Sequence, residues 1–247
     1  MKIFLGMNSS CKKSADNQII FSKDMKLVEL IDADYRLLSV LVRLNIRLPF
    51  GDVSIEQICQ QYGISVDMFL TICKVCSMAD YDPEIYDFTE RDLKLLLKYL
   101  QSSHSYYLTT LLPAVERGVE LVLEGCSVRQ SEILRKFYGD YAEEVRRHLA
   151  YEDMHLFPYI ENLGISECVT TKQMEDFMAE HDDICDKVDD IKSIIIKYLP
   201  EQCSTNERCQ LLFDLFAMRD DLAKHTAIEQ KILAPMVKAL ERRLGHE

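Results

Sequence analysis

Residues 148–158 read His148-Leu-Ala-Tyr-Glu152-Asp-Met-His-Leu-Phe-Pro158, and a near copy follows as His225-Thr-Ala-Ile-Glu229-Gln-Lys-Ile-Leu-Ala-Pro235. In both stretches a glutamate follows a histidine by four residues, and a proline follows the glutamate by six. Four residues are slightly more than one helical turn, so each His/Glu pair lies on one helix face with Cβ atoms about 6 Å apart. An imidazole and a carboxylate that converge from one face can bind a metal ion. One such pair arises by chance on many helices, whereas two copies with matching flanks indicate a site.

The repetition extends beyond the two pairs. His104 precedes His148 by 44 residues, and His181 precedes His225 by the same 44, so the offset between copies is 77 throughout. The second half of the chain therefore repeats a two-helix unit, and units of this kind bury their apolar faces against each other. Two helical hairpins that pack together form an up-down four-helix bundle, with the His and Glu side chains in its core. The four helices are expected at residues 90–124, 128–162, 171–199 and 205–243.

Capping residues support these boundaries. Each helix start fits or approximates a capping box, in which two side chains satisfy the unpaired amides of the first turn: Thr89/Asp92, Ser127/Gln130, Thr170/Gln173 and Ser204/Glu207. The corresponding stops are Gly125, Gly164, Pro200 and Gly245. Pro113 lies inside the first helix and is expected to kink it.

Composition supports an all-α protein. Hydrophobic residues make up 48% of the 247 positions, with only eight glycines and six prolines. The net charge of −12 argues against a general nucleic-acid binder. Nine scattered cysteines, an odd number, fit reduced thiols better than a secreted disulfide framework. With neither a signal peptide nor a run of about 20 apolar residues in the sequence, a soluble cytoplasmic protein without membrane contact is expected.

The chain before the bundle divides into two parts. Residues 1–25 are expected to be a flexible extension, and residues 26–80 a small helical N-terminal domain, followed by the bundle at 85–247. Within residues 54–76 a glycine turn at Gly63 separates two predicted helices, which is also the shape of a helix-turn-helix. The second of these helices carries almost no base-reading or phosphate-binding residues, so an accessory domain is the preferred interpretation.

Six residues are the candidate ligands for a pair of iron ions: His104, His148, Glu152, His181, His225 and Glu229. Four imidazoles and two carboxylates, which can bridge metals, suit such a pair. His155 is predicted to be structural or to support a ligand, because its repeat partner is Ile232. Further candidates to orient the imidazoles are Tyr107, Tyr151, Glu180, Asp182 and Asp183.

This arrangement of histidines and glutamates, with Leu-Phe-Pro after Glu152 and Glu180-His181-Asp182 in the third helix, resembles the hemerythrin-like (HHE cation-binding) domain. It is most similar to the di-iron proteins that repair iron–sulfur centres. The resemblance covers about residues 85–243 and implies a non-haem di-iron centre. His104, His148, His181 and His225 would be terminal ligands, and Glu152 and Glu229 would bridge the irons, together with an oxo bridge.

Two departures separate the chain from oxygen-carrying hemerythrins. Cys185 stands where those proteins have a fifth histidine, and His225-x-x-x-Glu229 replaces a longer His/Asp spacing. The N-terminal region also lacks the adjacent cysteine pair common in repair-type proteins; Arg47-Leu-Pro-Phe stands there instead.

The resemblance implies repair of iron–sulfur clusters under nitrosative or oxidative stress, with oxygen or nitric oxide as small ligand and iron–sulfur proteins as clients. An oxygen or nitric-oxide sensor with a regulatory, DNA- or protein-binding N-terminal domain is the alternative. Whether the protein is an enzyme and whether it forms a homodimer stay open.

Overall fold

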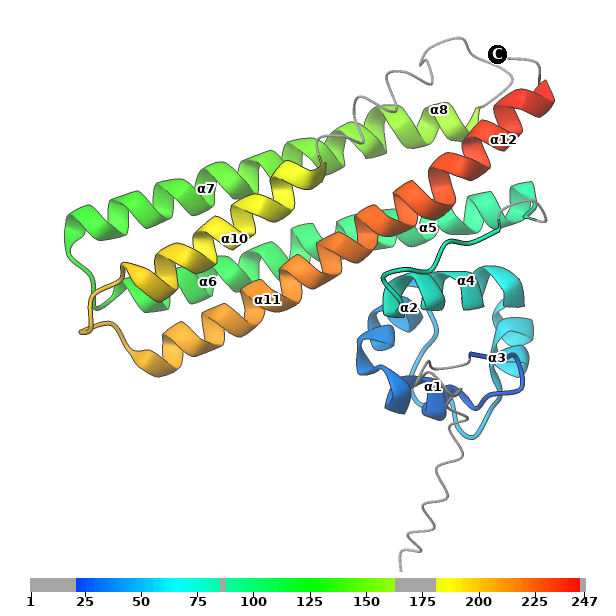
Figure 1. Ribbon diagram of the computed structural model, residues 1–247, viewed down its shortest axis with the longest axis horizontal. Coiled ribbons are helices and arrows are strands. Elements are labelled where there is room, and N and C mark those ends of the chain that lie inside the picture. Colours follow the sequence, from blue (N-terminus) through cyan, green and yellow to red (C-terminus); the bar gives the residue numbers. More distant parts are fainter. Residues whose placement is uncertain (1–20, 85–87, 163–180, 245–247) are drawn as a thin grey trace, which may run out of the picture. The chain divides into compact units, whose positions relative to one another are not determined.

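A computed structural model of the chain describes residues 21–84, 88–162 and 181–244 (Figure 1). The chain divides into two compact units, Met1–Leu95 and Leu96–Glu247. The division falls inside helix α5 (Glu90–Tyr106), after its first six residues. Within the first unit, the Arg91 guanidinium in α5 donates a hydrogen bond to the Gly63 carbonyl at 2.8 Å.

The N-terminal unit is a set of short helices: α1 (Leu27–Ala33), the 3₁₀ turn η1 (Tyr35–Leu37), α2 (Leu38–Arg43), α3 (Ile55–Tyr62) and α4 (Val66–Ser77). Phe21 and Met25, which precede α1, are also buried. Gly63 ends α3 in the left-handed conformation, with φ of 64°, where a residue without Cβ is favoured. Helix α4 is the buried helix of this unit, and Asp67 is its exposed side chain.

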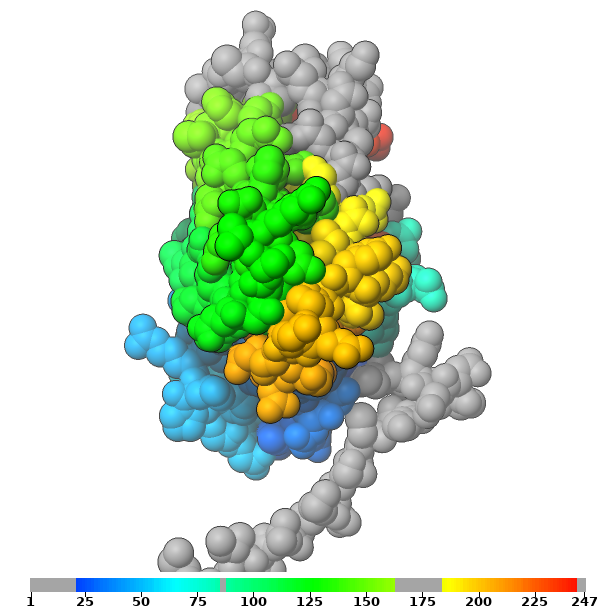
Figure 2. All heavy atoms as spheres, turned by 90° about the vertical axis from the view of Figure 1, so that its left-hand side faces the viewer, coloured from blue at the N-terminus to red at the C-terminus, as the bar shows by residue number. Residues whose placement is uncertain are grey.

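The second unit is built from four long helical stretches. They are α5–η2–α6 (Glu90–Leu123), α7–η3–α8 (Val128–Glu161), α10 (His181–Lys197) and α11–η4–α12 (Thr205–Leu244). Helix α6 packs against α7 and α11, and α10 packs against the same two helices, which closes a ring of four. Figure 2 looks onto one end of this ring, where α7 in green lies beside α10 and the start of α11 in yellow and orange. The prediction of an all-α protein with a four-helix bundle and an N-terminal helical region is confirmed.

The helix starts in the bundle are capped as the sequence predicts. Ser127 and Gln130 form a reciprocal capping box, and Thr89 and Asp92 exchange the same pair of bonds. Ser204 accepts a hydrogen bond from the Glu207 amide at 3.4 Å. The predicted cap at Thr170 lies outside the described residues.

Three of the four stretches contain a π-helical segment: η2 (Tyr107–Leu111), η3 (Glu152–Leu156) and η4 (Glu229–Leu233). In each, a proline follows the first residue of the segment by six, at positions 113, 158 and 235. A proline inside a helix lacks the N–H and pushes its ring against the carbonyl four residues earlier. The amide before each proline instead bonds to the carbonyl five residues earlier, which widens the turn: Leu112 to Tyr107, Phe157 to Glu152 and Ala234 to Glu229. The structure thus accommodates Pro113, where the sequence predicts a kink, with a π turn.

Apart from buried polar residues such as His104, Glu152 and His225, the bundle interior is lined by apolar side chains. Its buried side chains come from all four helical stretches and include Val115, Val119, Leu134, Tyr141, Val145, Val188, Ile191, Leu211, Leu215 and Met218. Among the described helices, none is long and apolar enough to cross a membrane.

Candidate metal centre

Five of the predicted ligands meet in the interior of the bundle. His104 comes from the end of α5, His148 from the last turn of α7, and His225 from the last turn of α11. Glu152 and Glu229 are the first residues of the π segments η3 and η4. All five are at most 6% exposed. Each of these two π turns therefore begins at a glutamate whose carboxylate lies in the centre of the bundle. π turns are frequent at functional sites.

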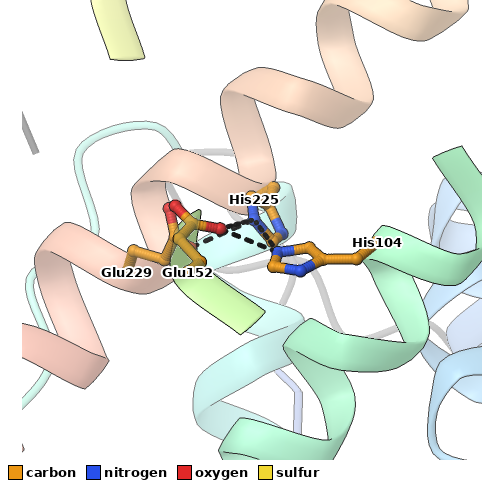
Figure 3. A group of neighbouring side chains, drawn as sticks. All are labelled: His104, Glu152, His225 and Glu229. Carbon is orange, nitrogen blue, oxygen red and sulfur yellow. Dashed lines mark hydrogen bonds and ion pairs between the residues drawn. The ribbon is translucent and has the colours of Figure 1, made fainter. Parts of the chain in front are cut away.

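The closest grouping joins two imidazoles and two carboxylates. Figure 3 shows His104 and His225 pointing toward the carboxylates of Glu152 and Glu229. One ligand atom from each of these four residues lies within 4.8 Å of the others. The Nε2 atoms of His104 and His225 are 3.2 Å apart, and His225 Nε2 is 3.1 Å from Glu229 Oε1. Nitrogen and oxygen donors from three helical stretches thus converge on one small, buried space.

The carboxylate of Glu152 lies between histidines of different helices. Its Oε2 atom is 2.9 Å from His104 Nε2 and 3.9 Å from His225 Nε2. Its Oε1 atom is 3.0 Å from His148 Nε2. The two oxygens therefore face different imidazoles, and this is the arrangement that a bridging carboxylate requires.

His104 is fixed on several sides. Its Nδ1 atom lies 2.9 Å from Asp153 Oδ1, and its ring stacks on Phe157 with centroids 5.3 Å apart. A neutral imidazole that donates Nδ1–H to Asp153 carries a lone pair on Nε2. That lone pair would face the anionic Oε2 of Glu152 at 2.9 Å, an arrangement that calls for a cation between the two atoms. A proton or a metal ion meets this requirement.

The local electrostatics favour positive charge. Burial lowers the pKa of His104, but the hydrogen bonds to Asp153 and Glu152 outweigh it and raise the pKa to about 9. For His225, burial again opposes the charged form, and the nearby charge of Glu229 with the hydrogen bonds to both glutamates raises the pKa. A buried carboxylate without a cation would be costly. The donor set, its burial and its charge therefore fit a bound cation.

The other predicted residues divide clearly. His181 begins α10, and its side chain lies outside the described part. His155 and Tyr151 are exposed, and their ring centroids lie 5.0 Å apart. Tyr107 reaches the cluster, because its buried ring meets His225 edge-on with centroids 5.5 Å apart. The acids flanking His181, as well as His246, are not among the described side chains.

Two features of the site were missed by reasoning from the sequence. The first is the contact between Asp153 and His104, which are 49 residues apart in the chain. The internal repeat does not indicate this contact, because the residue 77 positions after Asp153 is Gln230. The second feature is that Tyr107, like Glu152 and Glu229, is the first residue of a π segment. The sequence signal for it was the proline six residues after Tyr107, at the same spacing as the prolines that follow the two glutamates.

Two comparisons with known proteins were informative to different degrees. No curated protein matches the chain. Residues 96–242, more than half of the chain, match the family model of the hemerythrin HHE cation-binding domain. The matched segment contains every residue of the buried cluster and all four bundle stretches, apart from the first turns of α5 and the end of α12. The chain therefore belongs to the hemerythrin HHE cation-binding family.

Proposed function

We propose that the buried cluster binds two iron ions. Terminal ligands would be the four histidines and bridging ligands the two glutamates: His104, His148, His181, His225, Glu152 and Glu229. The observation that carries the proposal is the approach of the His104 and His225 Nε2 atoms, 3.2 Å apart, to the Glu152 carboxylate in a buried interior. Imidazole nitrogens at this separation beside a carboxylate are well placed to share a cation.

The position of Glu152 supports two metal ions over one. Its Oε2 faces His104 while its Oε1 faces His148, so each oxygen can serve a different ion. On one side the donor set is His104, His225 and Glu229, with Glu152 Oε2. On the other side Glu152 Oε1 and His148 are in place, and the repeat predicts His181 as a further donor.

The ligand chemistry is compatible with iron. Imidazoles and carboxylates suit several first-row metals, and the family match supports cation binding. Four neutral imidazoles with two carboxylates give less negative charge than the carboxylate-rich sites of ferritin-like bundles. When bound, iron would supply one-electron redox chemistry and Lewis acidity toward small molecules.

Residues around the cluster would hold the imidazole ligands in place. Asp153 holds the proton of His104 on Nδ1 and leaves Nε2 directed at the cluster. Phe157, fully buried, stacks on the same imidazole and excludes water from it. Tyr107 limits the movement of His225 through an edge-to-face contact, and its hydroxyl is anchored on the Asp221 carbonyl at 3.3 Å.

The cellular role follows from the resemblance to repair-type di-iron proteins. We propose that the protein acts in nitrosative or oxidative stress, with oxygen or nitric oxide as its small-molecule partner and damaged iron–sulfur proteins as clients. A sensor would use the same metal site and would differ in its output. Restoration of activity to a nitric-oxide-damaged iron–sulfur enzyme by the iron-loaded protein would support repair, and tight ligand binding without restoration would support the sensor.

Iron content tests the metal site directly. Protein purified from iron-supplemented cells should contain close to two irons per chain and show the absorption bands of a bridged di-iron centre. In Glu152→Gln the carboxylate between the imidazoles is lost, so one or both irons should be absent. Glu143→Gln changes an exposed carboxylate on the same helix and should keep both. Two irons and an unaltered spectrum in Glu152→Gln would refute the bridging assignment.

A further inference from the structure

Two cysteine thiols meet at one end of the bundle, away from the metal cluster. Cys126 lies in the connection between α6 and α7, and Cys203 lies in the connection between α10 and α11. Their Sγ atoms are 2.9 Å apart. The two residues are 77 positions apart, which is the offset of the internal repeat, so equivalent connections of the two hairpins carry the pair. These connections lie at the end of the bundle that faces the viewer in Figure 2.

A glycine allows the two connections to approach so closely. A Cβ atom on Gly125 would lie 2.8 Å from the Cys203 Cα and 2.9 Å from the Gln202 carbonyl oxygen, both backbone atoms. Any larger residue at position 125 would therefore separate the connections. The Arg208 guanidinium fixes the second connection by donating to the carbonyls of Pro200 and Cys203.

The two thiols differ in access to solvent. Cys203 is only 1% exposed, whereas Cys126 is half-buried and can be reached from outside. A disulfide brings its sulfur atoms to about 2.05 Å, so a movement of less than about 1 Å would join these two. An accessible thiol with a buried thiol in contact behind it is the arrangement of an attacking and a resolving cysteine.

We propose that Cys126 and Cys203 form a thiol–disulfide site whose substrate is a low-molecular-weight disulfide. The Cys126 thiolate attacks one sulfur of the disulfide, a sulfur–sulfur bond breaks, and the departing thiolate takes up a proton. Cys203, after losing its proton, then attacks the Cys126 sulfur and releases the second small thiol. Overall, the protein loses two protons and two electrons, and the small disulfide is reduced to two thiols.

The reaction would be slow near neutral pH. Burial and the adjacent Cys203 thiol raise the pKa of Cys126 to about 11, so little thiolate is present. The product would tie the two helical hairpins together at one end of the bundle. Cys126 precedes His148 by 22 residues, about 33 Å along a helix, so the proposal does not depend on metal binding.

Oxidised glutathione added to the full-length, iron-loaded protein tests the site. After hours at pH 8, alkylation and peptide mass spectrometry should show Cys126 and Cys203 joined to each other, with no glutathione on either. Exposed Cys209 should instead carry a glutathione. In Cys203→Ser the second step is blocked, so Cys126 should retain glutathione as a stable mixed disulfide. Glutathione persisting on Cys126 of the unmutated protein, or Cys203 remaining fully alkylated, would overturn the proposal.

A pair of glycine variants tests the geometry. Gly125→Ala inserts a Cβ against the Cys203 backbone and should slow formation of the Cys126–Cys203 bond at least tenfold. Gly139→Ala is the matched control, because a Cβ there meets nothing within 4 Å, and its rate should equal that of the unmutated protein. Equal rates in both variants would show that the close approach does not govern the reaction.

Discussion

The Nδ1 atom of His104 lies 2.9 Å from the Oδ1 atom of Asp153, the residue next to Glu152 in the chain. The segment η3 therefore contacts both nitrogens of one imidazole, with Asp153 on Nδ1 and Glu152 on Nε2. A carboxylate on the far nitrogen fixes the tautomer and the ring orientation of a metal-binding histidine. Asp153 and Glu152 thus both connect η3 to His104 of α5 at the cluster.

Asp153→Asn should weaken metal binding without unfolding the bundle. Loss of a carboxylate behind a ligating imidazole typically lowers metal affinity about 10- to 100-fold. Competition with a chelator measures the change, and circular dichroism checks the helix content. Asp140→Asn removes an exposed carboxylate from α7 and should leave the affinity as it was. An affinity in Asp153→Asn equal to that of this control would show that the contact does not orient His104.

Several features of the bundle were predictable because they are local or repeated. The 77-residue offset identified the histidines and glutamates, and short-range capping patterns located helix starts such as Ser127 and Ser204. These signals depend on spacing within a helix or between two copies of a unit, and both are visible in one chain.

Other features were missed because they depend on tertiary contacts or on a backbone change that helical periodicity does not show. The contact between His104 and Asp153 joins different helices, and no spacing rule relates them. A π turn shifts the helical register by a single residue, which the apolar periodicity is too coarse to show. For the thiols, the 77-residue offset of Cys126 and Cys203 was present in the sequence, but nothing there shows that the two connections meet.

Phe157→Ala should strongly destabilise the bundle. The Phe157 ring is fully buried and stacks on His104, so its removal leaves a cavity beside the cluster. Such truncations cost about 3–5 kcal/mol of unfolding free energy. Phe213→Ala removes the same side chain from a site that is 69% exposed, and it should change stability by less than about 0.5 kcal/mol. Urea unfolding of the metal-free proteins gives both values, and similar losses in the two variants would contradict the packing described for Phe157.

Ser77→Ala should change the acid response of the N-terminal unit. Burial acts to raise the pKa of Asp34, but the hydrogen bonds from Arg36 and Ser77 outweigh it and hold the pKa below its usual value of 3.8. A lowered pKa contributes stability that is present above the unfolded value of 3.8 and is lost as pH falls through the folded value. Without the Ser77 hydroxyl the Asp34 pKa should rise and stability near neutral pH should fall by about 0.5–1.5 kcal/mol.

Carboxyl-carbon NMR titration and urea unfolding measure these two effects of Ser77→Ala. Ser39→Ala is the control, because the exposed Ser39 hydroxyl bonds to the Arg36 carbonyl and not to Asp34. The difference between the two variants should shrink as the pH falls below 3.8, since Asp34 is then protonated in the unfolded state and increasingly in the folded state. A Ser77→Ala variant with an unmoved Asp34 pKa would refute the contribution of this hydrogen bond.

A fragment that starts at Tyr81 should bind metal as the full chain does. The residues of the buried cluster all lie within the unit Leu96–Glu247. Cys73 and Cys76 are buried in the N-terminal unit, and burial raises the pKa of Cys73 well above that of a free thiol, which disfavours the reactive thiolate. Metal per chain and the chelator-competition affinity of the fragment should therefore match those of the full chain. In the full chain, replacing Cys73 and Cys76 with alanine separates a structural role of these thiols from a chemical one. If this variant folds and binds iron but no longer reacts with nitric oxide, the thiols carry chemistry and the structural interpretation is wrong.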